Sequence, residues 1–85
     1  MKKIRLENVD RSGLHDLFEG IFPPPYGRNL DALHDILSCL NEPLTVEVNE
    51  PSLLATLGDR YCESLLRMFR DTAEENPNLT VTVLE

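Results

Sequence analysis

Residues 26–37 read Tyr26-Gly27-Arg28-Asn29-Leu30-Asp31-Ala32-Leu33-His34-Asp35-Ile36-Leu37, a turn that leads into a helical pattern. Side chains three and four residues apart are neighbours on a helix surface. One side of this helix is therefore an apolar stripe that would pack on a core, formed by Leu30, Leu33, Leu37 and Leu40. The other side gathers four polar residues, Asp31, His34, Asp35 and Ser38. The pattern predicts an amphipathic helix with a negatively charged outer face.

Strands are predicted before and after this helix. Apolar and polar residues alternate over residues 2–6, 44–48 and 79–84, as they do in half-buried strands. A further helix is expected between the first strand and Phe22, with Ser12 as its N-cap. The apolar stripe of that helix would be Leu14, Leu17, Phe18 and Ile21. Three prolines at residues 23–25 end the helix and hold the approach to Tyr26 in an extended form.

Two helical stretches follow the second strand. A short helical turn is expected over residues 51–57, ended by Gly58. Asp59 would then cap a longer helix, and the Asn76-Pro77 pair would end it. The apolar stripe of the longer helix consists of Cys62, Leu65, Leu66, Phe69 and Ala73. Asp71 lies opposite this stripe, so its side chain is expected to be exposed.

The order strand, helix, helix, strand, helix, helix, strand predicts an α/β fold. Helical crossovers return each strand in the same direction, so the sheet should be parallel and three-stranded, packed with about four helices. The alternation in every strand favours helices mainly on one face of the sheet. Eighty-five residues suit one small domain, which we expect to span residues 1–85.

The charge balance restricts the partners. A net charge of −7 and a pI near 4.7 disfavour direct binding to nucleic acid or anionic membranes, because phosphates would be repelled. A cationic partner is favoured instead. No apolar run approaches the roughly 20 residues that span a bilayer, and charged residues interrupt the start where a signal peptide would have its apolar core. The expected compartment is therefore the cytoplasm.

The two cysteines, Cys39 and Cys62, lie in two different helical patterns and lack a CxxC spacing. Reduced thiols are the expectation for both. Cys62 falls on the apolar stripe of its helix and is predicted to belong to the core. Cys39 lies at the flank of the acidic helix, where it either borders a docking surface or simply packs.

The stretch around residues 25–35 resembles the barstar family of intracellular ribonuclease inhibitors. The family signature is an aromatic residue, then Tyr-Gly-x-Asn-Leu-Asp-Ala-Leu, a second aromatic residue, and Asp. A second match lies in the last helix, where Met68-Phe69-Arg70-Asp71 corresponds to Val-Phe-Arg-Glu in the family. The final strand and the basic-apolar opening at residues 2–6 extend the resemblance to essentially the whole chain.

The resemblance implies a barstar-like two-layer fold and inhibition of a small basic ribonuclease, or of a related basic toxin, in a 1:1 complex of the toxin-antitoxin kind. Such a ribonuclease holds RNA phosphate with Arg and Lys side chains. An acidic helix can accept charge-assisted hydrogen bonds from the same cations and exclude RNA by occupancy. The partner-binding residues implied are Tyr26, Asn29, Asp31, His34, Asp35, Ser38 and Asp71, with Asp35 dominant. We expect a monomer when free, with no metal, cofactor or catalytic residue.

The chain departs from the family signature at three positions. Pro25 and His34 stand where family members that bind barnase carry aromatic residues, and Arg28 replaces an acid. The lost aromatic area should weaken binding to a barnase-type enzyme, so a different ribonuclease or another toxin with a basic active site stays open. His34 lies between two carboxylates, and its protonation would place a cation on the acidic face. We therefore expect affinity to fall as the pH drops through about 6.

Two other classes of function fit parts of the pattern. Asp31, His34 and Asp35 could form a metal site or an acid-base set, although the second imidazole, His15, lies in another helix and no P-loop or nucleophile motif is present. The scaffold could also serve as an adaptor or immunity module that binds a different basic protein. The replaced aromatic residues are the main support for this second alternative.

Overall fold

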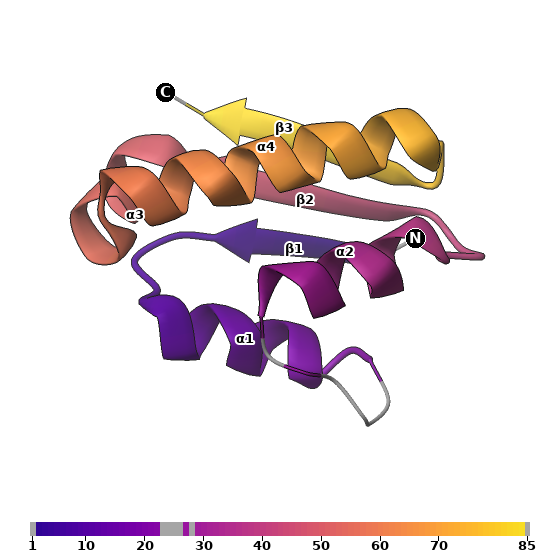
Figure 1. Ribbon diagram of the computed structural model, residues 1–85, viewed down its shortest axis with the longest axis horizontal. Coiled ribbons are helices and arrows are strands. Elements are labelled where there is room, and N and C mark those ends of the chain that lie inside the picture. The colour runs from indigo at the N-terminus through magenta and orange to yellow at the C-terminus, as the bar shows by residue number, and fades with distance from the viewer. Residues whose placement is uncertain (1, 23–26, 28, 85) are drawn as a thin grey trace.

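The computed structural model describes residues 2–22, 27 and 29–84 of the 85-residue chain. Within this part of the chain, strands and helices follow one another in the predicted order (Figure 1). They are β1 (Lys2–Leu6), α1 (Arg11–Glu19), α2 (Leu30–Ser38), β2 (Leu44–Asn49), α3 (Glu50–Leu57), α4 (Asp59–Glu75) and β3 (Leu79–Leu84).

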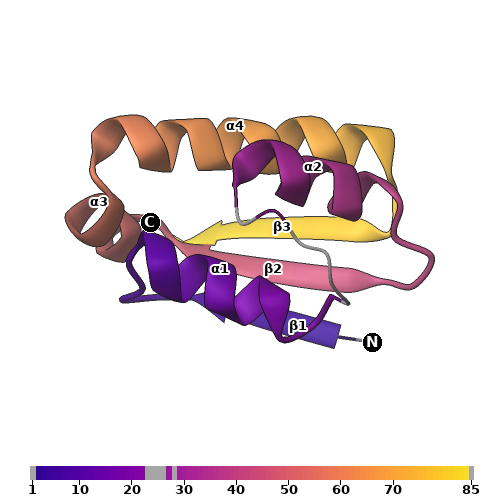
Figure 2. The same cartoon turned by 60° about the horizontal axis from the view of Figure 1, so that its bottom comes forward.

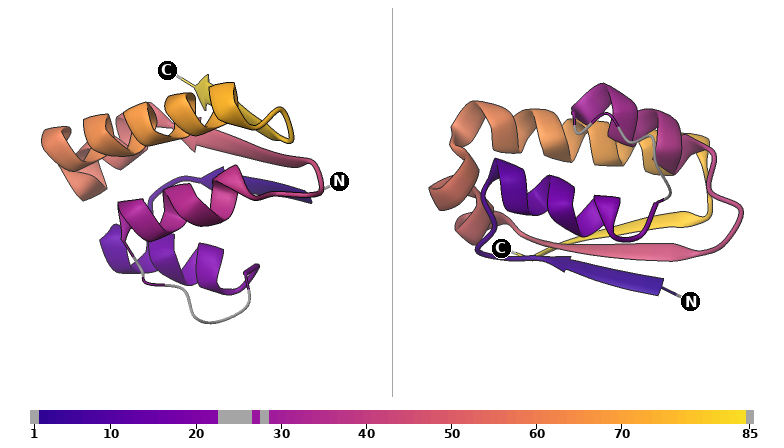
Figure 3. Two further views of the ribbon diagram at one scale, coloured as in Figure 1. Left: turned by 45° about the vertical axis from the view of Figure 1, so that its right-hand side comes forward. Right: turned by 90° about the horizontal axis from the view of Figure 1, so that it is seen from below.

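The strands form one parallel sheet in the order β1-β2-β3, as predicted. Ile4, Val46 and Val81 share one register row, and their side chains belong to the face that the helices cover. Helices α1, α2 and α4 lie on one side of the sheet, so the fold has two layers (Figure 3). The opposite face is polar, and there Lys3 forms an ion pair of 2.9 Å with Glu47.

The core lies between the two layers. The rings of Phe18 on α1 and Phe69 on α4 are both fully buried, with centroids 6.2 Å apart. Each fully buried side chain of this size contributes about 1.5–3 kcal/mol. Apolar side chains from α2, β1 and β2 complete this layer, including Leu33, Leu37, Leu6, Val46 and Val48, all with no exposed surface.

Two predicted helix caps were wrong. The N-cap of α1 is Asp10 and not Ser12, because the Asp10 carboxylate accepts a hydrogen bond of 2.7 Å from the Gly13 amide. Asp59 does not cap α4; it is the first helical residue, and Gly58 occupies the cap position without a side-chain hydrogen bond. Gly58 has φ of +86°, a conformation that favours glycine, and this lets α4 begin directly after α3.

Two predicted core positions also changed, and a third residue reaches the core from outside its predicted helix. Leu17 is 39% exposed, whereas His15 is buried, because α1 turns the face carrying His15 toward Tyr61 on α4. Near the end of α4, Thr72 is buried where Ala73 was expected, and Ala73 is only half-buried. The Thr72 hydroxyl donates a hydrogen bond of 2.7 Å to the Met68 carbonyl, so this polar group has a partner inside the core. Leu40 packs on the core from the loop, since α2 ends at Ser38.

Candidate partner-binding face

Helix α2 begins at a side-chain cap. Asn29 accepts a hydrogen bond of 2.8 Å from the Ala32 amide through its side-chain oxygen, and its side-chain nitrogen donates to the Gly27 carbonyl at 3.2 Å. This arrangement supplies a partner for an amide that has no intrahelical acceptor. Asn29 therefore sets the direction in which α2 leaves the turn. Asp31 follows in the first turn of the helix and is exposed.

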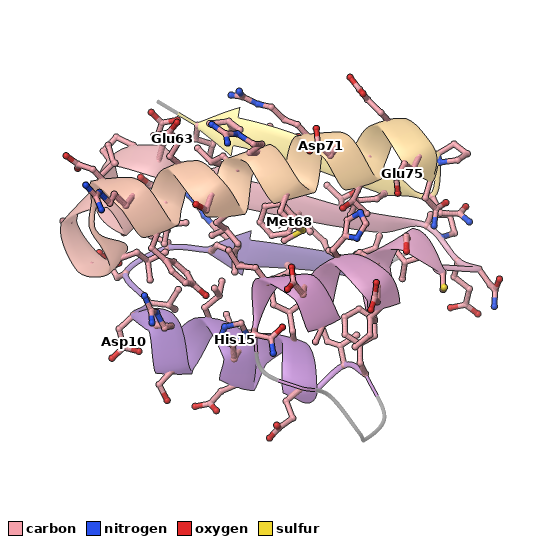
Figure 4. The ribbon with its side chains drawn as sticks, viewed as in Figure 1. Asp10, His15, Glu63, Met68, Asp71 and Glu75 are labelled. Carbon is pink, nitrogen blue, oxygen red and sulfur yellow. The ribbon has the colours of Figure 1, made fainter. Side chains whose placement is uncertain are left out.

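Helix α2 lies alongside the C-terminal part of α4 (Figures 1 and 2). Met68 points from α4 into the space between them (Figure 4). A cleft of about 310 Å³ opens there, lined by Leu30, Asp31, His34, Ser64, Arg67, Met68 and Asp71. Asp31 and His34 of α2 thus line the same cleft as Asp71 of α4, as predicted partner-binding residues from two distant parts of the sequence.

His34 links the two helices. Its Nε2 lies 3.3 Å from Glu75 Oε2 on α4, and its Nδ1 lies 3.9 Å from Asp35 Oδ1 on its own helix. About a third of the His34 side chain is exposed. Glu75 was not predicted as part of the face, although it follows Asp71 by four residues and so shares its side of α4. The imidazole therefore bridges the acidic residues of both helices.

Asp35 is highly exposed, with 86% of its side chain accessible. It lines a second, larger groove of about 640 Å³, on the side of α2 that faces the end of α1, together with Phe22, Ile36, Cys39 and other residues up to Leu44. Ser38, predicted as a partner contact, donates its hydroxyl to the backbone carbonyl of Asp35 at 2.9 Å. Asp35 thus stands apart from the cleft that holds Asp31 and Asp71.

The C-terminal end of α2 is held by two asparagines whose contact with this helix was not predicted. Asn76, which is 7% exposed, directs its side-chain nitrogen at three backbone carbonyls, those of Leu37, Ser38 and Leu40, at 3.1–3.2 Å. Asn78 donates to the Leu40 carbonyl as well, at 2.8 Å. The last carbonyls of a helix lack intrahelical partners, so these two asparagines cap α2 from a distant part of the chain.

Arg67 brings a cation into the cleft. Its Nη2 lies 3.0 Å from Glu63 Oε1, an i,i+4 pair on the surface of α4 in which both side chains are 71% exposed. The sequence shows the pairing by its spacing. The spacing does not show that Arg67 lies on the side of α4 that faces α2; this depends on how the two helices pack.

Behind this face, Tyr61 connects α4 to α1. Its hydroxyl lies 3.0 Å from His15 Nε2, and the Arg11 guanidinium lies 4.2 Å from the ring centroid. Burial raises the pKa of Tyr61, and the nearby charge of Arg11 partly opposes this. These contacts tie together the two helices that flank α2.

The cysteines follow the predictions. Cys62 is buried, Cys39 is exposed, and both are free thiols. Burial, with smaller effects from Glu50 and Asp59, raises the pKa of the Cys62 thiol. Cys39 follows the last turn of α2 and lines the groove beside Asp35, so it borders that groove rather than the core.

Residues 2–22, 27 and 29–84 contain no group of three or more His, Cys, Asp and Glu side chains placed to hold a metal ion. Within the same residues, no helix has the length and apolar character needed to cross a membrane.

The structure is thus a two-layer α/β domain in which carboxylates of α2 and α4 line a common cleft. The family model for Barstar (barnase inhibitor) matches residues 4–84, and the chain belongs to this family. Members of the family are inhibitors and not enzymes. No curated protein matches the chain. Of the predicted site residues, Tyr26 lies outside the described part of the chain, as do Pro25 and Arg28.

Proposed function

We propose that this protein is a cytoplasmic inhibitor of a small basic ribonuclease and binds it in a 1:1 complex. Membership of the barnase-inhibitor family supports the class of function. The net charge of −7 supports a basic partner, since opposite charges raise the rate of association.

The observation that supports the proposal is that α2 and α4 present three carboxylates, two of them in one cleft and the third beside the neighbouring groove. Asp31 and Asp71 line the cleft between α2 and α4, and the side chain of Asp35 is 86% exposed beside it. Arg and Lys side chains that hold RNA phosphate would donate charge-assisted hydrogen bonds to these oxygens. RNA is then excluded because its binding groups are already occupied.

We propose a separate role for each residue of the face. Asp35 is our choice for the dominant residue because its side chain is 86% exposed, so the carboxylate can enter a cationic pocket. Asn29 caps the start of α2, and the Ser38 hydroxyl donates a hydrogen bond to the Asp35 carbonyl near its end. Both contacts fix the conformation of the helix before a partner binds. Tyr26 would supply an aromatic anchor at the approach to α2.

A second candidate is an adaptor or immunity module for a different basic protein. His34 stands where the family carries an aromatic residue, and its ring is engaged with Glu75 rather than fully presented. Arg67 adds a cation to the same cleft. Both features would reduce the fit to a barnase-type active site and favour another cationic surface.

The test is a titration against a panel of small basic microbial ribonucleases, with RNA cleavage followed at low and high salt. Asp35→Ala is the test variant. Asp59→Ala is the matched control, because it removes the same charge from an exposed position at the far end of α4. Stoichiometric inhibition that salt weakens and that only Asp35→Ala abolishes would support the inhibitor. Silence of the wild-type protein across the panel would favour the adaptor.

A further inference from the structure

The cleft between α2 and α4 combines charges of both signs. Arg67 lines it together with Asp31 and Asp71, and 71% of the Arg67 side chain is exposed. A face that only imitated phosphate would carry acceptors and no cation. The inhibitor role alone does not account for the Arg67 guanidinium in this cleft.

Docking a basic protein here would bring its cations close to Arg67. Like charges placed opposite each other in an interface are costly, and the cost grows as water is excluded. This repulsion is avoided if the partner carries an anion opposite Arg67. Ribonuclease active sites can contain such an anion, because cleavage of RNA uses a general base as well as cations, and a carboxylate can serve as that base.

The local geometry suits a carboxylate. The ion pair with Glu63 at 3.0 Å uses Nη2 of Arg67 and holds the side chain along the surface of α4. A guanidinium has five N–H donors in a planar fork that matches a carboxylate. Among the described residues its one ion pair is with Glu63, so donors remain for a partner.

We infer that Arg67 is a specificity-determining residue that pairs with a carboxylate at the edge of the target's cationic pocket, while Asp31 and Asp71 meet the cations beside it. The inference rests on the proposed function. It narrows the partner to a basic ribonuclease with an acidic group next to its phosphate-binding side chains. A target whose surface is cationic throughout would be disfavoured.

The test compares Arg67→Gln and Arg67→Glu with Arg70→Gln and Arg70→Glu. Arg70 is an exposed arginine of the same helix that does not line the cleft. Inhibition constants are measured against each ribonuclease that the wild-type protein inhibits. Arg67→Gln should weaken inhibition about tenfold and Arg67→Glu more, whereas both Arg70 variants should leave it unchanged or strengthen it slightly.

The sign of the effect is decisive. If only overall charge mattered, removing any cation from the inhibitor would strengthen its binding to a basic enzyme. Inhibition that Arg67→Glu leaves unchanged or improves would overturn the inference while the inhibitor role stood. Failure of the wild-type protein to inhibit any enzyme would overturn both. Thermal melts of all four variants establish that each is folded before it is assayed.

A second measurement locates the carboxylate. Each Asp and Glu around the active site of the inhibited ribonuclease is changed to its amide, and binding is measured calorimetrically with wild-type protein and with Arg67→Gln. In a double-mutant cycle, one of these positions should couple to Arg67 and none to Arg70. Absence of coupling at every position would contradict the pairing.

Discussion

The side-chain nitrogen of Asn76 donates a hydrogen bond of 3.1 Å to the carbonyl of Leu37, which joins the residue after α4 to the last turn of α2. The same nitrogen also lies within hydrogen-bond distance of the carbonyls of Ser38 and Leu40. Through this contact the end of the helix that carries Asp35 is attached to the end of the helix that carries Asp71.

Asn76→Ala should therefore destabilise the fold and loosen α2 in particular. The change removes a donor from three carbonyls and an acceptor from the Asn78 amide, and a buried polar group left unpaired costs about 1–3 kcal/mol. We expect a loss of at least about 2 kcal/mol in the free energy of unfolding by urea denaturation. Hydrogen exchange of the last α2 amides should accelerate more than that of β2. Asn41→Ala, at an exposed loop position, serves as control and should change little.

Gly58→Ala should destabilise the junction of α3 and α4 by about 1–3 kcal/mol, because φ of +86° with ψ of 160° is a conformation that residues with a Cβ avoid. A Cβ at this position would meet no other atom within 4 Å, so the effect would be purely conformational. Gly20→Ala is the matched control, since Gly20 has φ of −70° and its Cβ would make only ordinary contacts. Equal melting temperatures for the two variants would contradict this account.

Asp35→Asn should raise the melting temperature of the free protein while it weakens inhibition. Removal of one charge relieves repulsion on a face kept acidic for binding. Asp31→Asn should gain less, because Asp31 lies in the first turn of α2, where a negative charge favourably meets the helix dipole. Thermal melts and inhibition assays on the same samples check both effects. A lower melting temperature for both variants would count against the idea that these acids are retained for function.

His34→Phe should strengthen binding to a barnase-type enzyme, because it adds the aromatic area that the family carries at this position. The change also removes the contact between the imidazole and Glu75, which lies 3.3 Å away. Calorimetric titration of the wild-type protein and the variant with the same enzyme measures the difference in affinity. Equal or weaker binding by His34→Phe would contradict the expected gain from an aromatic side chain.

Stability should decline in alkali because of Cys62. Its pKa is raised in the folded state, so the folded protein keeps the thiol proton to higher pH than the unfolded chain. This contribution is complete below about pH 8.5 and is lost as the pH rises through the folded pKa. Urea unfolding at about pH 7 and about pH 9.5 should show the loss. Cys39→Ser should retain the decline, and in native protein a thiol reagent should modify Cys39 well before Cys62.

The predictions that held were those carried by local patterns. Alternation identified all three strands, and the spacing of Leu30, Leu33 and Leu37 identified the acidic helix. Two of the errors lay in helix caps, because several polar residues near one helix end can each act as the cap. Asp10 and not Ser12 is the N-cap of α1, because the Asp10 carboxylate accepts a hydrogen bond from the Gly13 amide. The burial of His15 in place of Leu17 depended on Tyr61, a partner from another helix.

The sequence by itself determined the order of the elements, the parallel sheet and the acidic side of α2. These follow from side-chain periodicity, from chain breakers, and from the rule that helical crossovers keep strands parallel. Only the tertiary structure decided which side of α4 meets α2. That packing brings Asp71 and Arg67 to Asp31, pairs His34 with Glu75, and seats Asn76 on the end of α2. Such contacts depend on how two helices are rotated and crossed against each other, which no local pattern specifies.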